Sequence, residues 1–149
     1  MLSSKAKYGL KAMVHLARRE SERAVLIMEI AEAERIPKKF LDAILLDLKN
    51  HGLLNSKKGK GGGYSLARPA ASITVGEIVR ILDGPLAPVP CVSRTAYRRC
   101  DDCRDETTCA IRAVMGDVRD AIASILDNTT LAGMAAAAGT TEPVFMYDI

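Results

Sequence analysis

All four cysteines of this 149-residue chain fall within nineteen consecutive positions, with the spacing C-x8-C-x2-C-x5-C: Cys91, Cys100, Cys103 and Cys109. The side chains between them are mostly charged and would make a poor hydrophobic core, while three prolines just before them favour an extended, irregular loop. The chain begins without the apolar stretch of a secretory leader, so we expect a reducing compartment. Crowded thiols there more often hold a metal or a cluster than form disulfides.

Three kinds of thiol site are compatible with this spacing. The C-x-x-C pair of Cys100 and Cys103 occurs in redox, zinc and iron-sulfur sites alike. A thioredoxin-type role is disfavoured, because no βαβ pattern surrounds the pair and the two intervening aspartates oppose thiolate formation. Structural zinc usually takes two such pairs, whereas iron-sulfur clusters accept irregular spacings. We therefore predict an iron-sulfur cluster, 2Fe-2S or 4Fe-4S, held by three or four of these cysteines, with zinc or metal-free thiols as alternatives.

The charge of the chain is divided between its two parts. Residues 1–68 carry fourteen Lys and Arg against seven Asp and Glu, residues 69–149 carry seven against eleven, and all nine lysines lie at or before Lys60. The basic part is therefore the candidate nucleic-acid face, with a solvated helix surface as the alternative. A 48% hydrophobic content predicts a globular domain. No apolar run approaches the roughly 18 residues of a membrane span, so we expect a cytoplasmic protein with no membrane partner.

The basic part has the periodicity of a helix-turn-helix. A first helix, capped by Ser3 or Ser4, should run to about Arg19, and a short second helix should cover residues 27–34. The third should begin at Pro37, with apolar residues at helical spacing: Leu41, Ile44, Leu45 and Leu48. In a helix-turn-helix this last helix enters the major groove by its first residues, here Lys38, Lys39 and Phe40. The alternative is an ordinary helical hairpin, which two acidic residues of the same helix favour: Asp42 and Asp47.

A β-hairpin should follow. Residues 53–57 and 64–67 have the composition of two short strands, and the tip between them contains four glycines. Glycine lets the backbone approach another surface closely, and the lysines around the tip favour phosphate contacts: Lys57, Lys58 and Lys60. The glycine spacing does not match a nucleotide-binding P-loop. The hairpin is therefore predicted to be a DNA-contacting wing, with an inert hairpin as the alternative.

The acidic part should contain two more helices, one on each side of the cysteines. Thr74 can cap a helix that ends at Gly84, and a long helix should run from about Glu106 to Leu126. Five apolar residues of the long helix are spaced 4-3-4-3: Ile111, Met115, Val118, Ile122 and Ile125. Such a seam favours pairing with a second copy across a two-fold axis, with packing on its own domain as the alternative. One more turn is expected near Leu131.

Several motifs together resemble the bacterial Rrf2 (Rrf-two) family of transcriptional regulators: Ser4-Lys5-x-x-Tyr8, Ile36-Pro-x-x-Phe40-Leu41, Gly59-x-Gly61-Gly-Gly-Tyr64 and Ile73-Thr-Val-Gly-Glu-Ile78. The resemblance covers about residues 2–134. It implies a homodimeric winged-helix transcription factor, usually a repressor, whose cluster-binding members carry three cysteines between the winged domain and the dimerisation helix. Among the motif residues we also assign Ser4, Lys5 and Tyr64 to DNA binding.

The chain departs from the family pattern at the cluster site. The spacing from Cys103 to Cys109 is kept, but the gap after Cys91 is longer and Cys100 is extra. A histidine that serves as the fourth ligand in some members corresponds to Arg112, and an aspartate that serves in others corresponds to Tyr8. Neither is a plausible iron ligand, so Cys100 is predicted to complete a four-thiolate site.

We expect a winged helix-turn-helix domain over residues 1–84, a sensor loop over 85–109, a dimerisation helix with its following turn over 106–134 and a flexible tail over 135–149. The predicted function is that of a repressor or dual regulator that binds a nearly palindromic operator in double-stranded DNA under control of the cysteine site. An enzyme acting on a small-molecule substrate is disfavoured, because His15 and His51 lack motif partners for catalysis. A zinc-stabilised interaction module without DNA binding is the remaining alternative.

Overall fold

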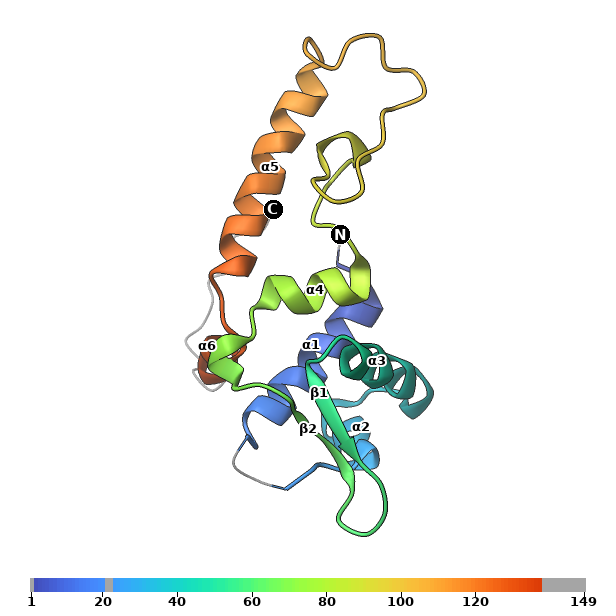
Figure 1. Ribbon diagram of the computed structural model, residues 1–149, viewed down its shortest axis with the longest axis vertical. Helices are drawn as coiled ribbons and strands as arrows, with labels where there is room; N and C mark the ends of the chain where they lie inside the picture. Colours follow the sequence, from blue (N-terminus) through green and yellow to red (C-terminus); the bar gives the residue numbers. More distant parts are fainter. Residues whose placement is uncertain (1, 21–22, 138–149) are drawn as a thin grey trace.

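The computed structural model describes residues 2–20 and 23–137, which form a mainly helical winged domain with an arm projecting from it (Figure 1). The elements are α1 (Ser4–Ala17), α2 (Ile27–Glu34), α3 (Lys38–Asn50), β1 (Leu54–Lys57), β2 (Gly63–Leu66), η1 (Ala70–Ser72), α4 (Val75–Asp83), η2 (Pro90–Val92), α5 (Ala110–Asp127) and α6 (Leu131–Ala137). The predicted fold class, mainly α with a small β wing, is confirmed. No helix in the described ranges is long and apolar enough to cross a bilayer.

Local sequence signals set the ends of several helices. The hydroxyl of Ser3 accepts a hydrogen bond from the N–H of Ala6 (3.0 Å), and that of Thr74 accepts one from the N–H of Glu77 (3.1 Å). Each hydroxyl satisfies a backbone donor that has no partner within the helix, so α1 and α4 begin where the sequence predicts. Arg35 ends α2 in the left-handed conformation (φ 54°). The tight turn that results connects α2 to α3, and the two helices pack against each other.

The core lies between α1, α2, α3, α4 and α6. The predicted apolar positions of α3 are all buried, and fully buried partners come from the other helices: Met13, Ile30, Ile78 and Leu131. The buried face of α1 combines the large side chains of Met13 and Leu16 with small residues, Ala6, Gly9 and Ala12. Leu10, Val14 and Ala17 of α1 are only half-buried, and a Cβ at Gly9 would overlap the side chain of Leu82. This close approach of α1 and α4 sets which face of α1 is covered.

The wing is a two-stranded antiparallel hairpin with Leu54 opposite Leu66 and Lys57 opposite Gly63. A short stretch before α2 extends it, because Val25 and Tyr64 each donate their N–H to the other's carbonyl (2.8 Å). Figure 1 shows the tip of the hairpin at one end of the molecule and the loop that carries the cysteines at the opposite end. The wing and the cysteines are thus separated by the body of the winged domain.

The arm consists of α5 and the loop that rises beside it (Figure 1). The helix begins at Ala110, four residues later than predicted from the sequence, because residues 104–108 form turns and Cys109 is the N-cap. After α5 the chain returns to the winged domain, where α6 packs Leu131 into the core. This helix continues through Ala137, so residues 135–137 are helical where the sequence predicts a tail. The rest of the predicted tail, 138–149, lies outside the described residues.

Candidate DNA-binding surface and thiol site

The first turn of α3 presents the side chains predicted to enter the major groove. Lys38, Lys39 and Phe40 are all exposed, and 60% of the Phe40 surface is accessible to solvent. A large aromatic side chain left in water beside two lysines has little structural role within the domain. It is suited to an apolar contact with a base edge, such as a thymine methyl group.

The acidic residues of α3 are paired with lysines. Lys38 bonds to Asp42 (3.0 Å) one turn away, and Lys5 of α1 bonds to Asp47 (2.7 Å). All four side chains are between two-fifths and about half exposed, and such pairs contribute at most about 1 kcal/mol. Phosphate groups could replace the aspartates at small cost. The two acidic residues therefore do not make this surface unsuitable for DNA.

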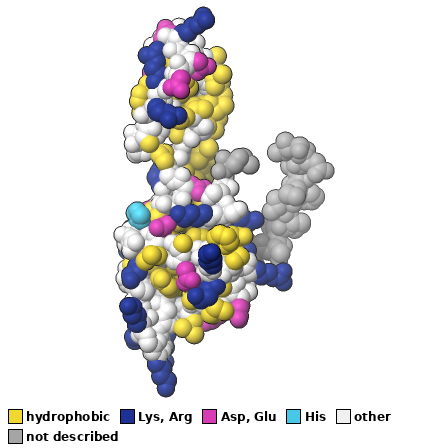
Figure 2. Space-filling view, turned by 90° about the vertical axis from the view of Figure 1, so that its right-hand side faces the viewer, with side chains coloured by type: hydrophobic (Ala, Val, Ile, Leu, Met, Phe, Trp, Pro, Cys, Tyr) yellow, Lys and Arg dark blue, Asp and Glu magenta, His cyan; other side chains and the backbone are white. Residues whose placement is uncertain are grey.

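The wing adds a second basic surface. Lys57, Lys58 and Lys60 are exposed along the hairpin, and Figure 2 shows Lys or Arg side chains at the corresponding end of the molecule. Tyr64 differs from them, since it is half-buried and packs against the core. Its place on β2 fits support of the wing. Ser4, in the first turn of α1, is exposed.

All four cysteines are free thiols and border one cavity of about 390 Å³. Cys91 is buried in η2, Cys100 is exposed, and Cys103 is half-buried. Cys109 caps α5, where its Sγ accepts the N–H of Arg112 (3.5 Å). The structure thus brings together around one space the cysteines that the sequence separates by up to eighteen positions.

The loop around this cavity is held by short-range polar contacts. The hydroxyl of Tyr97 donates to Glu106, and Asp105 accepts hydrogen bonds from the backbone and hydroxyl of Thr107 (2.9 and 2.7 Å). These bonds lower the pKa of Asp105, and the bond to Glu106 raises the pKa of Tyr97. Loss of solvent around its sulfur raises the pKa of the Cys100 thiol, and the neighbouring cysteines and Asp102 raise it further. In the metal-free loop Cys100 is therefore protonated at neutral pH.

The donor set matches that of an iron-sulfur cluster, but the thiols are not yet in a ligating arrangement. Four cysteine sulfurs are the usual ligands of 2Fe-2S and 4Fe-4S clusters. Within the described ranges, however, no three Cys, His, Asp or Glu side chains are disposed to hold a metal ion. A cluster would require the thiols to converge further. Binding and ordering of the exposed part of the loop would then be coupled.

Two residues at the family's non-cysteine ligand positions do not supply an iron ligand. Arg112 borders the cavity, and its buried Nε has no hydrogen-bond partner in the described part of the chain, but guanidinium is always protonated and does not bind iron. Tyr8 packs against the core of the winged domain instead. Among the histidines, His15 is buried and bonded to Glu34 (3.0 Å), and His51 bonds within its own helix. Neither borders the cysteine cavity.

The long helix of the arm exposes an apolar face. No residue of α5 is buried within the described structure, and Ile111 and Ile125 are each 66% exposed. Val118 and Ile122 lie on the same face, as does Val114, which the predicted seam omits, whereas Met115 is half-buried at its edge. Val114 breaks the 4-3 spacing, but it lies three residues from Ile111 and four from Val118, which a helical projection would have revealed. Figure 2 shows hydrophobic side chains along the arm.

A helix-turn-helix with exposed basic residues, a lysine-bearing wing and a separate helical arm define a winged-helix DNA-binding regulator. The chain belongs to the Rrf2 family, whose model, described as "Iron-dependent Transcriptional regulator", matches residues 2–137. The protein is accordingly a transcriptional regulator, as are its relatives, and the predicted family is confirmed.

The relatives cover nearly the whole chain. An Rrf2-like HTH-type transcriptional regulator of Rhodobacter capsulatus is 46% identical over 140 residues, which are 92% of this chain and 93% of the relative. The HTH-type transcriptional regulator CymR of Bacillus subtilis is 32% identical over 148 residues, or 99% of each chain. IscR of Escherichia coli is 30% identical over 130 residues, 87% of this chain and 76% of the relative.

Solved structures of two of these regulator types share the fold. CymR, described as the global cysteine regulator of B. subtilis, superposes with a TM-score of 0.77 at 32% identity and covers 92% of this chain and 97% of its own. IscR of T. potens gives a TM-score of 0.74 at 30% identity, with 100% of this chain and 93% of its own covered. CymR of Staphylococcus aureus, solved in an oxidised form, gives 0.72 at 31% identity, with 91% and 95% covered.

Proposed function

We propose that this Rrf2-family regulator is a cytoplasmic homodimer that represses transcription by binding nearly palindromic operator DNA. An iron-sulfur cluster on its four cysteines controls this DNA binding. The observation that carries the proposal is the single cavity bordered by Cys91, Cys100, Cys103 and Cys109. This cavity lies beside the start of the helix that connects the cysteine loop to the winged domain.

The cysteines have different roles in this proposal. Cys91 and Cys109 belong to η2 and to the N-cap of α5, so the backbone fixes them before any metal arrives. Cys100 and Cys103 belong to the loop between them and would close on the cluster from the solvent side. A bound cluster supplies iron whose oxidation state or loss changes the charge and order of the loop. The family description as iron-dependent supports iron over zinc.

A metal-free thiol regulator is the second candidate. Cys91, Cys103 and Asp102 all lie close enough to Cys100 to raise its pKa, and no three of the described cysteines are yet disposed for a metal. A relative with a similar fold, the S. aureus CymR, has been solved in an oxidised form. In this case oxidation of neighbouring thiols to a disulfide would replace cluster loss as the signal. A zinc site would hold the loop without redox response.

DNA binding by a dimer would use both basic surfaces. Two copies of α3, related by a two-fold axis, would enter major grooves about one helical turn apart, roughly 34–36 Å. The lysines of the wing would add phosphate or minor-groove contacts. Phosphate contacts supply affinity and α3 supplies sequence selectivity, so a nearly palindromic site is expected.

The decisive experiment purifies the full chain without oxygen and measures visible absorption together with iron, sulfide and zinc per protein. DNA is then selected by the wild-type protein from a random duplex pool, and its affinity is compared for iron-loaded and chelator-treated protein. Iron with equimolar sulfide and a change in affinity on chelation is the expected result. Zinc alone, or affinity that responds only to thiol oxidants, would replace the cluster by one of the alternatives.

A further inference from the structure

The arm is joined to the winged domain at the carboxyl end of α5. The N–H of Val75 donates to the carbonyl of Thr129 (2.9 Å), and the N–H of Leu131 donates to that of Ile73 (2.8 Å). These two bonds pair the chain before α4 with the chain after α5. Since Leu131 is fully buried in the core, this end of α5 cannot shift without moving the start of α4.

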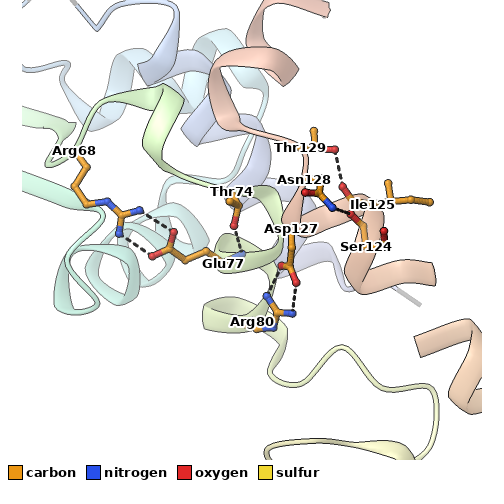
Figure 3. A network of polar contacts seen from close by, with 9 residues as sticks. All are labelled: Arg68, Thr74, Glu77, Arg80, Ser124, Ile125, Asp127, Asn128 and Thr129. Atoms are coloured by element: carbon orange, nitrogen blue, oxygen red, sulfur yellow. Dashed lines mark hydrogen bonds and ion pairs between the residues drawn. The ribbon is translucent and has the colours of Figure 1, made fainter. Parts of the chain in front are cut away.

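One ion pair connects the two helices directly. Arg80 of α4 donates to both carboxylate oxygens of Asp127, the last residue of α5, at 2.5 and 2.9 Å (Figure 3). These hydrogen bonds lower the pKa of Asp127, so the carboxylate stays charged at neutral pH. Gly76 leaves room for the pair, because a Cβ there would overlap Asp127 Oδ1 and displace the carboxylate.

The same helix α4 is joined to the wing on its other side. Glu77 accepts two hydrogen bonds from Arg68, at 2.8 and 2.9 Å, and Arg68 lies two residues after β2. Figure 3 shows the two pairs on either side of α4. A polar path therefore runs from Asp127 through α4 to the base of the wing, and buried residues of α4 such as Ile78 contact the core that supports α3.

The other end of α5 lies at the cysteine site. Cys109 is the N-cap of the helix, whose middle contacts η2, where Arg119 Nη1 donates to the carbonyl of Val92 (2.6 Å), the residue after Cys91. An 18-residue helix is about 27 Å long, so α5 spans the distance from the cysteine loop to the winged domain. A cavity of about 430 Å³ lies between α5 and part of the loop. The three arginines that line this cavity, Arg80, Arg94 and Arg119, each bond to an aspartate of the chain. Along this part of the arm α5 is therefore not densely packed against the loop.

From this arrangement we infer that Arg80 and Asp127 are positioning residues that transmit the state of the cysteine site to the winged domain, with α5 as the rigid connection. The inference rests on the proposed control of DNA binding by that site. The two side chains are 40% and 42% exposed, and exposed pairs add little to stability, so the pair can be broken without unfolding the domain. Its role is to make α4 follow α5.

Three variants break the contact in different ways. Asp127→Asn and Arg80→Gln each remove one charge, while Gly76→Ala keeps both charges and displaces the carboxylate. Alanine is a better helix former than glycine, so Gly76→Ala does not loosen α4 by lowering helix propensity. Asp117→Asn is the matched control, because it removes the same charge from an exposed position of the same helix. The exchange Arg80→Asp with Asp127→Arg rebuilds the pair in reverse.

The test measures the ratio of DNA affinities between iron-loaded and chelator-treated protein, on the duplex selected by the wild type, together with iron content and melting temperature. Each of the three variants should lower this ratio of affinities at least fivefold, towards 1, while its iron content stays unchanged. A factor of about five is at the lower end of typical coupling between two sites. The control should keep the wild-type ratio, and the charge exchange should restore most of it. A ratio within twofold of wild type in both Asp127→Asn and Gly76→Ala would overturn the inference alone. A wild-type ratio of 1 would remove the proposed function and the inference together.

Discussion

The apolar face of α5 gives the sharpest prediction, which concerns assembly. Ile122 lies near the middle of this face and is 36% exposed in the single chain. If a second copy covers the face, Ile122→Glu places a carboxylate in the interface, and the two-fold axis places a second one there. Glutamate is tolerated in a helix, so the change leaves α5 itself intact.

The magnitude follows from burial. Full burial of an isoleucine stabilises by about 1.5–3 kcal/mol, so the third of Ile122 that is still exposed accounts for about 0.5–1 kcal/mol per subunit. Burying an unpaired carboxylate costs about 3 kcal/mol or more, again once per subunit. The dimer therefore loses about 7 kcal/mol, or about five decades in dissociation constant. A dimer with nanomolar affinity would become a monomer at micromolar concentration.

Sedimentation equilibrium of the metal-free protein at about 1 μM, a concentration well above a nanomolar dissociation constant, should give a monomer for Ile122→Glu and a dimer for the wild type. Met115→Glu, at the edge of the face, should act in the same direction. Ala113→Glu is the control, because Ala113 is exposed on the opposite side of the helix. The monomers should also lose selective DNA binding, which needs two recognition helices. An intact dimer in Ile122→Glu with unchanged circular dichroism would show that the face is covered by something other than a second copy of α5.

Three further predictions concern the wing, the thiols and acid stability. Lys58→Ala should weaken binding to all DNA sequences and reduce the slope of log affinity against log salt by about 1, and an unchanged slope in a binding titration would remove Lys58 from the contact surface. Cys100→Ala should lose iron nearly as completely as Cys103→Ala in anaerobic preparations, whereas full loading of the Cys100 variant would mean that only three cysteines are ligands. The hydrogen bonds from Arg68 lower the pKa of Glu77, so their stabilisation is present at neutral pH and is lost as the pH falls through the lowered pKa. Urea unfolding should therefore show Glu77→Gln less stable than wild type by at most about 1 kcal/mol at pH 7, with the difference shrinking below about pH 4. A difference that stays constant across this pH range would show that the Arg68–Glu77 pair does not cause it.

The winged domain was predictable because its signals are local. Side-chain caps such as Thr74, the helical spacing of Leu41 to Leu48 and the glycine-rich hairpin each act within one or two turns of chain. The predicted start of α5 is four residues too early, because no local signal marks the true start. A cysteine is not among the preferred capping residues, so the sequence does not mark Cys109 as an N-cap.

The contacts that the sequence does not predict all join segments that are distant along the chain. The Val25 bridge to Tyr64, the burial of Leu131 and the pairing of Arg80 with Asp127 have no periodic signal in either segment. The cysteine loop is similar, since its spacing suggests a shared site but does not define how far the thiols stand apart. The structure gathers them around one cavity and leaves the final convergence to whatever binds there.

The positions of the wing and the thiols limit how the cysteines could act on DNA. The loop that carries the cysteines and the tip of the wing lie at opposite ends of the molecule, so we do not expect the cysteines to contact DNA that is bound by the wing (Figure 1). In the mechanism inferred above, an effect of the thiols on DNA passes along α5, which contacts η2 near its middle and α4 at its end and which exposes an apolar face. Its apolar face would change the spacing of two recognition helices in a dimer, whereas Asp127 changes the setting of α4 within one subunit. Because the apolar face and Asp127 belong to one helix, we expect a shift at Cys109 to alter dimer geometry and winged domain together, and a cluster there would then affect selectivity as well as affinity.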